Sequence, residues 1–208
     1  MARPLRLEFP GALCHLTARG NARAPIFLDD EDRELFLQLL GREVEQQRWR
    51  LCAYCLMDNH YHLLVETSEP SLARGMARLD AVYTAAFNRR HRARRALFPG
   101  ALQEHPGGSG GLFPGALPPL VLNPVRAKIC KNPAGYRWSS YLATLGRCAI
   151  APWLDAQAML KSFGGDPEAQ HAAHRKSVAQ GVGPASLWKA LRARKSSARW
   201  KTVTLMGA

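Results

Sequence analysis

The sequence predicts an α+β fold in which helices cover one face of an antiparallel sheet. Two observations predict it. Strand-like and helix-like segments alternate in the order β-α-β-β-α in the first half of the chain, and a short turn joins two of the strands as a hairpin. With one further strand, this order becomes the split βαβ, or ferredoxin-like, sheet. Amphipathic segments after residue 150 predict a helical C-terminal extension.

The predicted strands lie close together in the sequence. Residues 11–18 (GALCHLTA) form the first, and the turn-rich Arg19-Gly20-Asn21 follows them. Residues 50–57 (RLCAYCLM) and 60–67 (HYHLLVET) form two more, separated by the tight turn Asp58-Asn59. These two strands should pair as an antiparallel hairpin.

Two long helices are predicted between and after these strands. Asp29 or Asp30 can cap a helix that runs to about Trp49, because apolar residues recur at helical spacing and acidic residues crowd its first turn. Ser71 is the expected cap of the second helix. That helix carries Tyr83 on its apolar stripe and ends in a basic cluster.

The segment where the last strand of the sheet belongs is anomalous. Residues 99–119 (PGALQEHPGGSGGLFPGALPP) are so rich in proline and glycine that we expect no regular element there, and therefore a damaged sheet edge. Beyond it, residues 122–130 and 136–146 look ordered and partly helical. Residues 152–163 and 169–182 are helix candidates.

Composition favours a polyanionic partner. The chain has 208 residues, with 29 Lys and Arg against 16 Asp and Glu, a net charge of +13 and a pI near 10.1. The alternative is a protein that is basic without such a partner. No apolar run is long enough to span a bilayer and the start lacks a secretory signal, so a cytoplasmic location is expected. Cys52 and Cys55 form a CxxC within a predicted strand, where this spacing points to opposite faces and argues against a metal site.

His60 and His62 are the first candidate site residues. They alternate on a predicted strand, so both imidazoles should lie on one face, where they can bind one divalent ion side by side. The alternative is a pair of polar residues on a solvated face.

Tyr83 is the candidate nucleophile. A tyrosine can attack a phosphodiester and remain as a covalent phosphotyrosine, provided that a nearby metal polarises the phosphate. We expect His60 and His62 to project toward the helix that carries Tyr83. The alternative is an aromatic residue of the core.

These motifs together resemble a known family. The segment MDNHYHLLVE, followed by YTAAFNRRH, resembles the single-tyrosine HUH transposases of the IS200-like type, and more narrowly the REP-associated tyrosine transposases. The N-terminal MARPLRLEFPGALCHLTARGN, the later LNPVRA and WSSY, and PWLDAQAMLKSFG also resemble blocks of that family. The matching blocks cover most of residues 1–100 and 121–185.

The resemblance implies a function. The two histidines of the His-hydrophobic-His motif would bind Mg²⁺ or Mn²⁺, and Tyr83 would cleave single-stranded DNA at hairpin repeats through a covalent 5′-phosphotyrosine. The third metal ligand is in doubt because Phe87, one helical turn after Tyr83, cannot ligate. Asn88 is the nearest candidate, although an offset of five residues turns it away from Tyr83.

The expected DNA contacts are basic or polar. The resemblance implies that the loop at residues 19–21 reads a guide sequence beside a hairpin. The residues expected to contact DNA are Arg3, Arg19, Asn21, Arg89 and Arg90. The chain would divide into an HUH transposase-like domain at 1–147 and a helical extension with a basic tail at 148–208.

Two other functions remain open. One is a DNA-binding remnant of such a transposase that no longer cuts, and the other is a metal-dependent RNA-processing enzyme. The segment 101–119 bears on the first. Its codons can be chosen so that a shifted reading frame gives YKSILVEAGAYFLELS, close to the family's missing strand and helix. A frameshift would leave residues 101–119 irregular and the activity weak or absent.

Overall fold

The structure is a computed structural model that describes residues 12–98, 103–109, 120–161 and 163–181. Its regular elements, in chain order, are β1 (Ala12–Arg19), the 3₁₀ turn η1 (Asn21–Arg23), α1 (Asp30–Gln47), β2 (Arg50–Met57), β3 (His60–Thr67), α2 (Leu72–Arg90), β4 (Gln103–Ser109), α4 (Asn123–Arg126), the 3₁₀ turn η2 (Pro133–Gly135), α5 (Tyr141–Thr144), α6 (Ala156–Lys161) and α7 (Pro167–Gln180).

The sheet confirms the predicted fold class. Its four strands lie in the order β2-β3-β1-β4, and every neighbouring pair is antiparallel. This is the strand order of the split βαβ sheet. β2 and β3 have the predicted bounds, and Asp58-Asn59 joins them as predicted.

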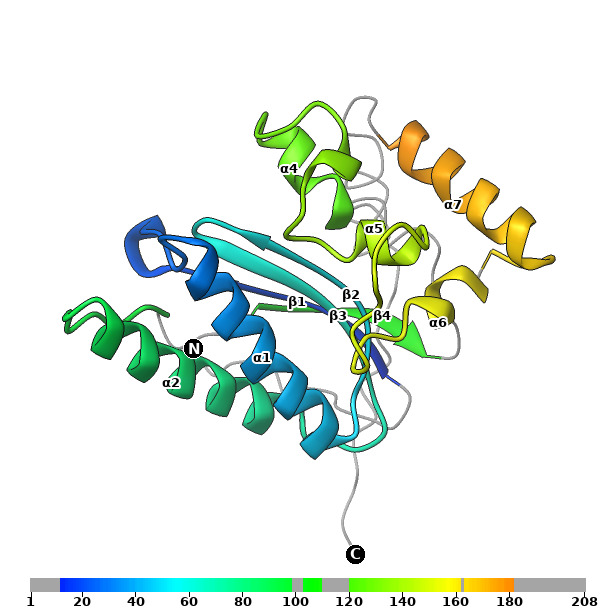
Figure 1. The fold of residues 1–208 in the computed structure, drawn as a ribbon. Helices are drawn as coiled ribbons and strands as arrows, with labels where there is room; N and C mark the ends of the chain where they lie inside the picture. Colours follow the sequence, from blue (N-terminus) through cyan, green and yellow to red (C-terminus); the bar gives the residue numbers. More distant parts are fainter. Residues whose placement is uncertain (1–11, 99–102, 110–119, 162, 182–208) are drawn as a thin grey trace, which may run out of the picture.

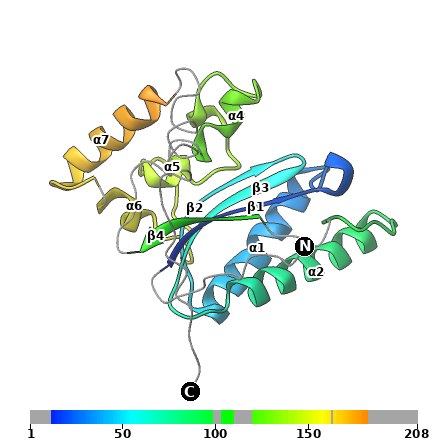
Figure 2. The same cartoon turned by 180° about the vertical axis from the view of Figure 1, so that it is seen from behind.

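α1 and α2 pack side by side against one face of the sheet (Figure 1). Apolar rings fill the space between: Phe36 of α1 lies 5.2 Å from Tyr83 of α2 and 4.8 Å from Tyr61 of β3, between ring centroids. In both Figure 1 and Figure 2, the sheet separates this helix pair from α4–α7.

The two long helices begin where the sequence indicates, but only one has the expected cap. Asp29 accepts a hydrogen bond from the Asp32 amide at 2.9 Å and caps α1. Ser71 precedes α2 but makes no side-chain cap. Its hydroxyl instead accepts a hydrogen bond from Trp49 Nε1 at 2.9 Å, and this prediction for Ser71 was wrong because a buried indole N–H takes its oxygen.

β4 is the main correction to the sequence-based expectation. Residues 103–109 form a strand paired with β1, with His105 opposite His15 and Gln103 opposite Thr17, although we expected irregular backbone. An edge strand tolerates proline and glycine because one side of its backbone needs no partner. The β1–β4 register also shifts between the pairs Ala12–Ser109 and Cys14–Pro106, where β4 holds one extra residue. A shifted reading frame was expected to leave residues 101–119 irregular, and the strand at residues 103–109 contradicts that expectation. Residues 110–119 lie outside the described residues.

The other sheet edge is covered by the segment that follows α4. The Leu56 amide donates to the Trp138 carbonyl at 2.9 Å, and the Ser140 amide donates to the Tyr54 carbonyl at 3.0 Å. A second contact joins Leu51 to Leu154 in a parallel bridge. These bonds fix the C-terminal helices to β2. No helix in the described part of the chain is long and apolar enough to cross a membrane.

Candidate functional site

Three loops meet at one end of the sheet. The Gly20 amide donates to the Asn59 carbonyl at 2.8 Å, the Asn21 amide donates to the Leu97 carbonyl at 2.7 Å, and the Ile26 amide donates to the Asp58 carbonyl at 2.8 Å. We call this end, made of residues 20–28, 58–59 and 92–98, the loop end. The bonds from Gly20 and Ile26 hold the β2–β3 turn, and therefore the start of β3, against the segment that follows β1.

His60 and His62 lie on one face of β3, as predicted. Their ring centroids are 4.9 Å apart, at an interplanar angle of 82°. His60 stands at the loop end, where its Nδ1 lies 2.7 Å from Asn59 Oδ1. Both side chains are partly exposed.

The face that carries the histidines is not the one we expected. Tyr61, between them, donates its hydroxyl hydrogen bond to Asp80 of α2 at 2.8 Å and packs on Phe36 of α1. Side chains alternate along a strand, so His60 and His62 project to the opposite face, away from α1 and α2. The prediction that the histidines face the helix of Tyr83 was therefore wrong.

Tyr83 lies within the core on the helix side. Its side chain is fully buried, and its hydroxyl donates to the Ile26 carbonyl at 2.6 Å. The rings of Phe27 and Phe36 contact it, with centroids 5.6 and 5.2 Å away. Burial raises the pKa of the Tyr83 phenol far above its ordinary value, and the neighbouring Asp32 raises it further. This environment opposes formation of a phenolate.

Each of the other tyrosines also makes a hydrogen bond or a ring contact within the fold. The chain contains five, all within the described residues. Tyr61 bonds to Asp80, Tyr136 donates to the Leu56 carbonyl, Tyr54 packs on Trp153, and Tyr141 packs on His174.

His15 and Thr17, which were not among the residues predicted for the site, lie beside His62 on β1. Thr17 Oγ1 is 3.0 Å and His15 Nε2 is 3.2 Å from His62 Nδ1, and the two imidazole rings stack with centroids 5.3 Å apart. Thr17 is the direct cross-strand partner of His62. Their alternation on a predicted strand indicates that residues 15 and 17 share a face. Their position beside His62 depends on the register between β1 and β3, which the sequence of one strand alone does not determine.

The expected third metal ligand, Asn88, is engaged in a structural contact. Its Nδ2 donates to the Arg95 carbonyl at 2.9 Å, and its Oδ1 accepts from the Arg95 amide at 3.0 Å. Both ends of the amide therefore hold the chain after α2. The structure does not bring Asn88 to the histidines.

One other group has the composition of a metal site. Asp29, Asp32 and His91 place ligand atoms within 4.8 Å of one another, the only such set of three or more His, Cys, Asp or Glu residues in the described part of the chain. Arg90 already occupies it: its Nη1 lies 2.8 Å from Asp29 and 2.6 Å from the buried Asp32. This cluster joins the start of α1 to the end of α2.

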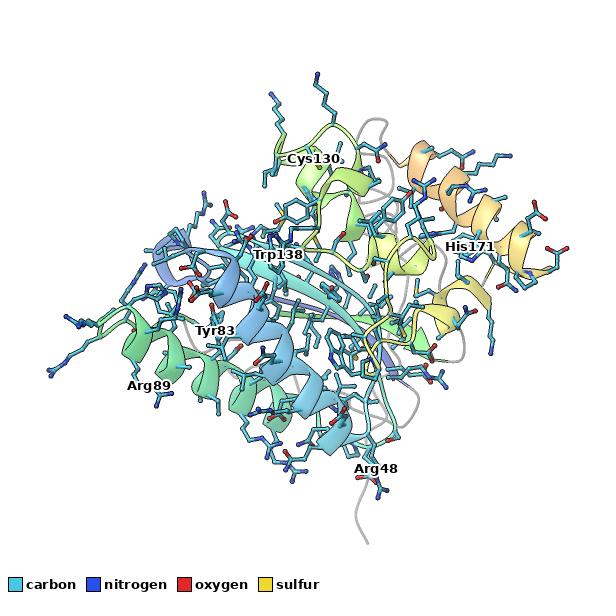
Figure 3. All side chains as sticks on the ribbon, in the orientation of Figure 1. Arg48, Tyr83, Arg89, Cys130, Trp138 and His171 are labelled. Carbon is cyan, nitrogen blue, oxygen red and sulfur yellow. The ribbon has the colours of Figure 1, made fainter. Side chains whose placement is uncertain are left out.

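The residues expected to contact DNA divide into three groups. Arg19, Asn21 and Arg89 are exposed, and Arg89 projects outward from α2 (Figure 3). Arg90 is instead paired with Asp29, Glu31 and Asp32, which gives it a structural role. Arg3 lies outside the described residues.

A pocket of about 300 Å³ opens at the loop end. Asn21, Pro25, Arg95 and Leu97 line it with neighbouring alanines. Beside it, Ala22 and Arg23 have left-handed backbone angles, with φ of 51° and 60°. Such conformations are unfavourable for residues other than glycine and tend to occur at functional sites.

The histidine pair fits part of a divalent metal site. Burial lowers the pKa of His60 to about 4, and the nearby Arg19 contributes to the same shift. The imidazole is therefore neutral near pH 7, which is the form that ligates metals. His60 and His62 could supply two ligands from one face, whereas Asn88 is not placed to supply a third.

Comparison with known proteins agrees with this architecture. Residues 10–102 match the family model described as IS200-like transposase. A solved structure of a REP-associated tyrosine transposase bound to a REP hairpin superposes with a TM-score of 0.61 at 14% identity, covering 80% of this chain and 93% of that chain. No curated protein matches the chain. Both comparisons agree with the resemblance seen in the sequence: residues 10–102 match the IS200-like transposase model, and the chain has the fold of a REP-associated tyrosine transposase.

Proposed function

We propose that this protein is a transposase-derived DNA-binding protein. It binds hairpin DNA with a single-stranded flank and holds Mg²⁺ or Mn²⁺ at His60 and His62, but it forms no covalent phosphotyrosine. The buried position of Tyr83 carries the proposal, because it separates the expected nucleophile from the histidines by the thickness of the sheet.

Charge and loop geometry support DNA binding. The net charge of +13 favours a polyanion through counterion release. Exposed arginines surround the loop end, where the pocket next to Asn21 offers space for an unstacked base: Arg19, Arg23, Arg92 and Arg94. The structurally similar transposase is bound to a REP hairpin, which supports a hairpin as the DNA form.

The histidine pair supports a metal role. When bound, a divalent ion at His60 and His62 would neutralise and orient a phosphate. The neutral His60 and the polar residues next to His62 suit this role. The exposed Arg19, opposite His60 in the strand register, is placed to contact the same DNA backbone.

The burial of Tyr83 argues against cleavage by this residue. To reach a phosphate, Tyr83 would have to leave an aromatic core and break its bond to the Ile26 carbonyl. Removing a buried aromatic side chain from a core costs about 3–5 kcal/mol. Burial also prevents Tyr83 from reaching DNA bound to a second copy of the chain.

A strand-transferase function is the second candidate, and the family match favours it. Residues 10–102 include the histidine pair and Tyr83, the residues that the sequence resemblance assigns to metal binding and cleavage. In that case, DNA binding would have to rearrange α2.

One experiment distinguishes the two candidates. A labelled hairpin with single-stranded flanks is incubated with the protein and Mn²⁺, then analysed on native and denaturing gels. We expect a complex on the native gel and no labelled protein after denaturation. A covalent adduct that disappears in Tyr83→Phe would establish the strand transferase instead.

A further inference from the structure

We infer that Asn59 and Thr17, with His15, are positioning residues that set the tautomers of His60 and His62. They hold the proton on Nδ1 of each imidazole and leave Nε2 as the nitrogen that binds metal. This inference rests on the proposed metal role of the two histidines.

The contact at His60 defines its tautomer. Asn59 Nδ2 donates to the Arg23 carbonyl at 3.0 Å, and this bond fixes which end of the amide is the oxygen. The oxygen Oδ1 then faces His60 Nδ1 at 2.7 Å. An amide oxygen can only accept, so Nδ1 of His60 carries the proton. In a neutral imidazole, the lone pair must then be on Nε2.

The contacts at His62 also favour a proton on Nδ1. Thr17 Oγ1 and His15 Nε2 both approach Nδ1, at 3.0 and 3.2 Å. The Thr17 hydroxyl can accept a hydrogen bond from Nδ1, and His15 Nε2 can do so when the His15 proton is on its own Nδ1. A metal on Nε2 requires a proton on Nδ1, and this proton needs an acceptor because the site is partly buried. Thr17 and His15 supply that acceptor. The stacked His15 ring, inclined by 20°, also limits rotation of the His62 ring.

Both histidines of the pair are therefore held in the same form by neighbours on different elements. Asn59 belongs to the β2–β3 turn at the loop end, and Thr17 belongs to β1. Groups that orient metal-ligating histidines in this way typically change metal affinity 10- to 100-fold when they are removed.

Matched pairs of variants test the inference. Thr17→Val removes the hydroxyl at nearly constant shape, whereas Thr17→Ser retains it. Asn59→Leu removes the acceptor, whereas Asn59→Asp retains an acceptor oxygen for His60 Nδ1 but loses the donor to the Arg23 carbonyl. Binding of Mn²⁺ alone is followed by electron paramagnetic resonance of the free ion, and we expect Thr17→Val and Asn59→Leu to weaken it about 10- to 100-fold. Thr17→Ser should remain within about threefold of the unmodified protein, and Asn59→Asp should bind Mn²⁺ more tightly than Asn59→Leu, because it keeps an acceptor oxygen for His60 Nδ1.

Long-range ¹⁵N NMR of the histidine side chains provides a second readout that needs no metal. We expect His60 and His62 in the Nδ1–H tautomer, and loss of that preference at His62 in Thr17→Val and at His60 in Asn59→Leu. Unchanged tautomers in both variants, or an Nε2–H tautomer in the unmodified protein, would overturn the inference. If the unmodified protein binds no Mn²⁺ yet shows these tautomers, the proposed metal role fails and the positioning contacts stand.

Discussion

The hydroxyl of Tyr83 stabilises the fold through one buried hydrogen bond. Tyr83→Phe keeps the ring in its aromatic cluster but leaves the Ile26 carbonyl without this donor, so we expect the free energy of unfolding to fall by about 1–3 kcal/mol. Urea unfolding measures the change. Affinity for hairpin DNA should not change, because the hydroxyl lies on the helix side of the sheet. A stability equal to that of the unmodified protein would show that this bond does not form.

His174 of α7 should make stability depend on pH. It is fully buried between Tyr141 and Phe163, and neither ring nitrogen has a hydrogen-bond partner among the described residues. Burial lowers the pKa of His174 to about 4, with smaller effects from His171 and Arg175.

The sign follows from the folded and unfolded pKa values. Above pH 6.5 the imidazole is neutral in both states, so its contribution is fully present. As the pH falls from 6.5 toward 4, only the unfolded state takes up the proton and stability is lost, by about 2 kcal/mol at pH 5. His174→Leu should reduce the difference in unfolding free energy between pH 7.5 and pH 5 by that amount. An unchanged pH dependence would contradict the buried neutral histidine. His60 also has a lowered pKa, but it is present in both proteins and cancels.

At the scale of elements, α2 packs closely against the end of α1. A Cβ added at Gly75 would lie 2.5 Å from two ring atoms of Trp49, which is itself held by its bond to Ser71. Alanine normally stabilises a helix relative to glycine, but here Gly75→Ala should lower the free energy of unfolding by about 1–3 kcal/mol through overpacking. Gly135→Ala is the control, because nothing lies within 4 Å of its added Cβ. Equal unfolding midpoints for the two variants would contradict this packing.

The elements of the first half could be predicted from local patterns. Residues 50–57 and 60–67 are short strand-like segments on either side of a tight turn, and this local pattern was enough to give the bounds of both strands. β4 could not be predicted in this way. Its proline and glycine content opposes a strand, and only its pairing with β1 makes it one.

The candidate site was predicted only in part, for a similar reason. The shared face of His60 and His62 follows from one strand's period, but the side of the sheet on which that face lies depends on which neighbours pack on Tyr61. Tyr83 has the same apolar spacing whether it lines a core or a site. The sequence predicts a phosphate contact for Arg90, because the acidic start of α1 that pairs with it lies about sixty residues earlier in the chain and is brought beside it only by the fold.

At the scale of the whole molecule, neighbouring arginines should differ in function. Arg89→Ala removes an exposed charge, so we expect weaker hairpin binding and a salt slope reduced by about 1 if Arg89 contacts a phosphate. Arg90→Ala removes the cation that neutralises Asp29, Glu31 and Asp32, so it should lower stability more than DNA affinity. Fluorescence anisotropy between 50 and 200 mM salt, with urea unfolding of both variants, gives the comparison. The reverse pattern would contradict the assigned roles.

The central claim is that DNA binds at the loop end and the histidine face, on the side of the sheet away from Tyr83. Amide hydrogen exchange with and without a hairpin carrying single-stranded flanks tests it most directly. We predict slower exchange at residues 20–25, 58–60 and 92–97 on DNA binding, and no change in the centre of α2 around Tyr83. Protection confined to α7, or faster exchange around Tyr83 as α2 rearranges toward the DNA, would contradict the claim.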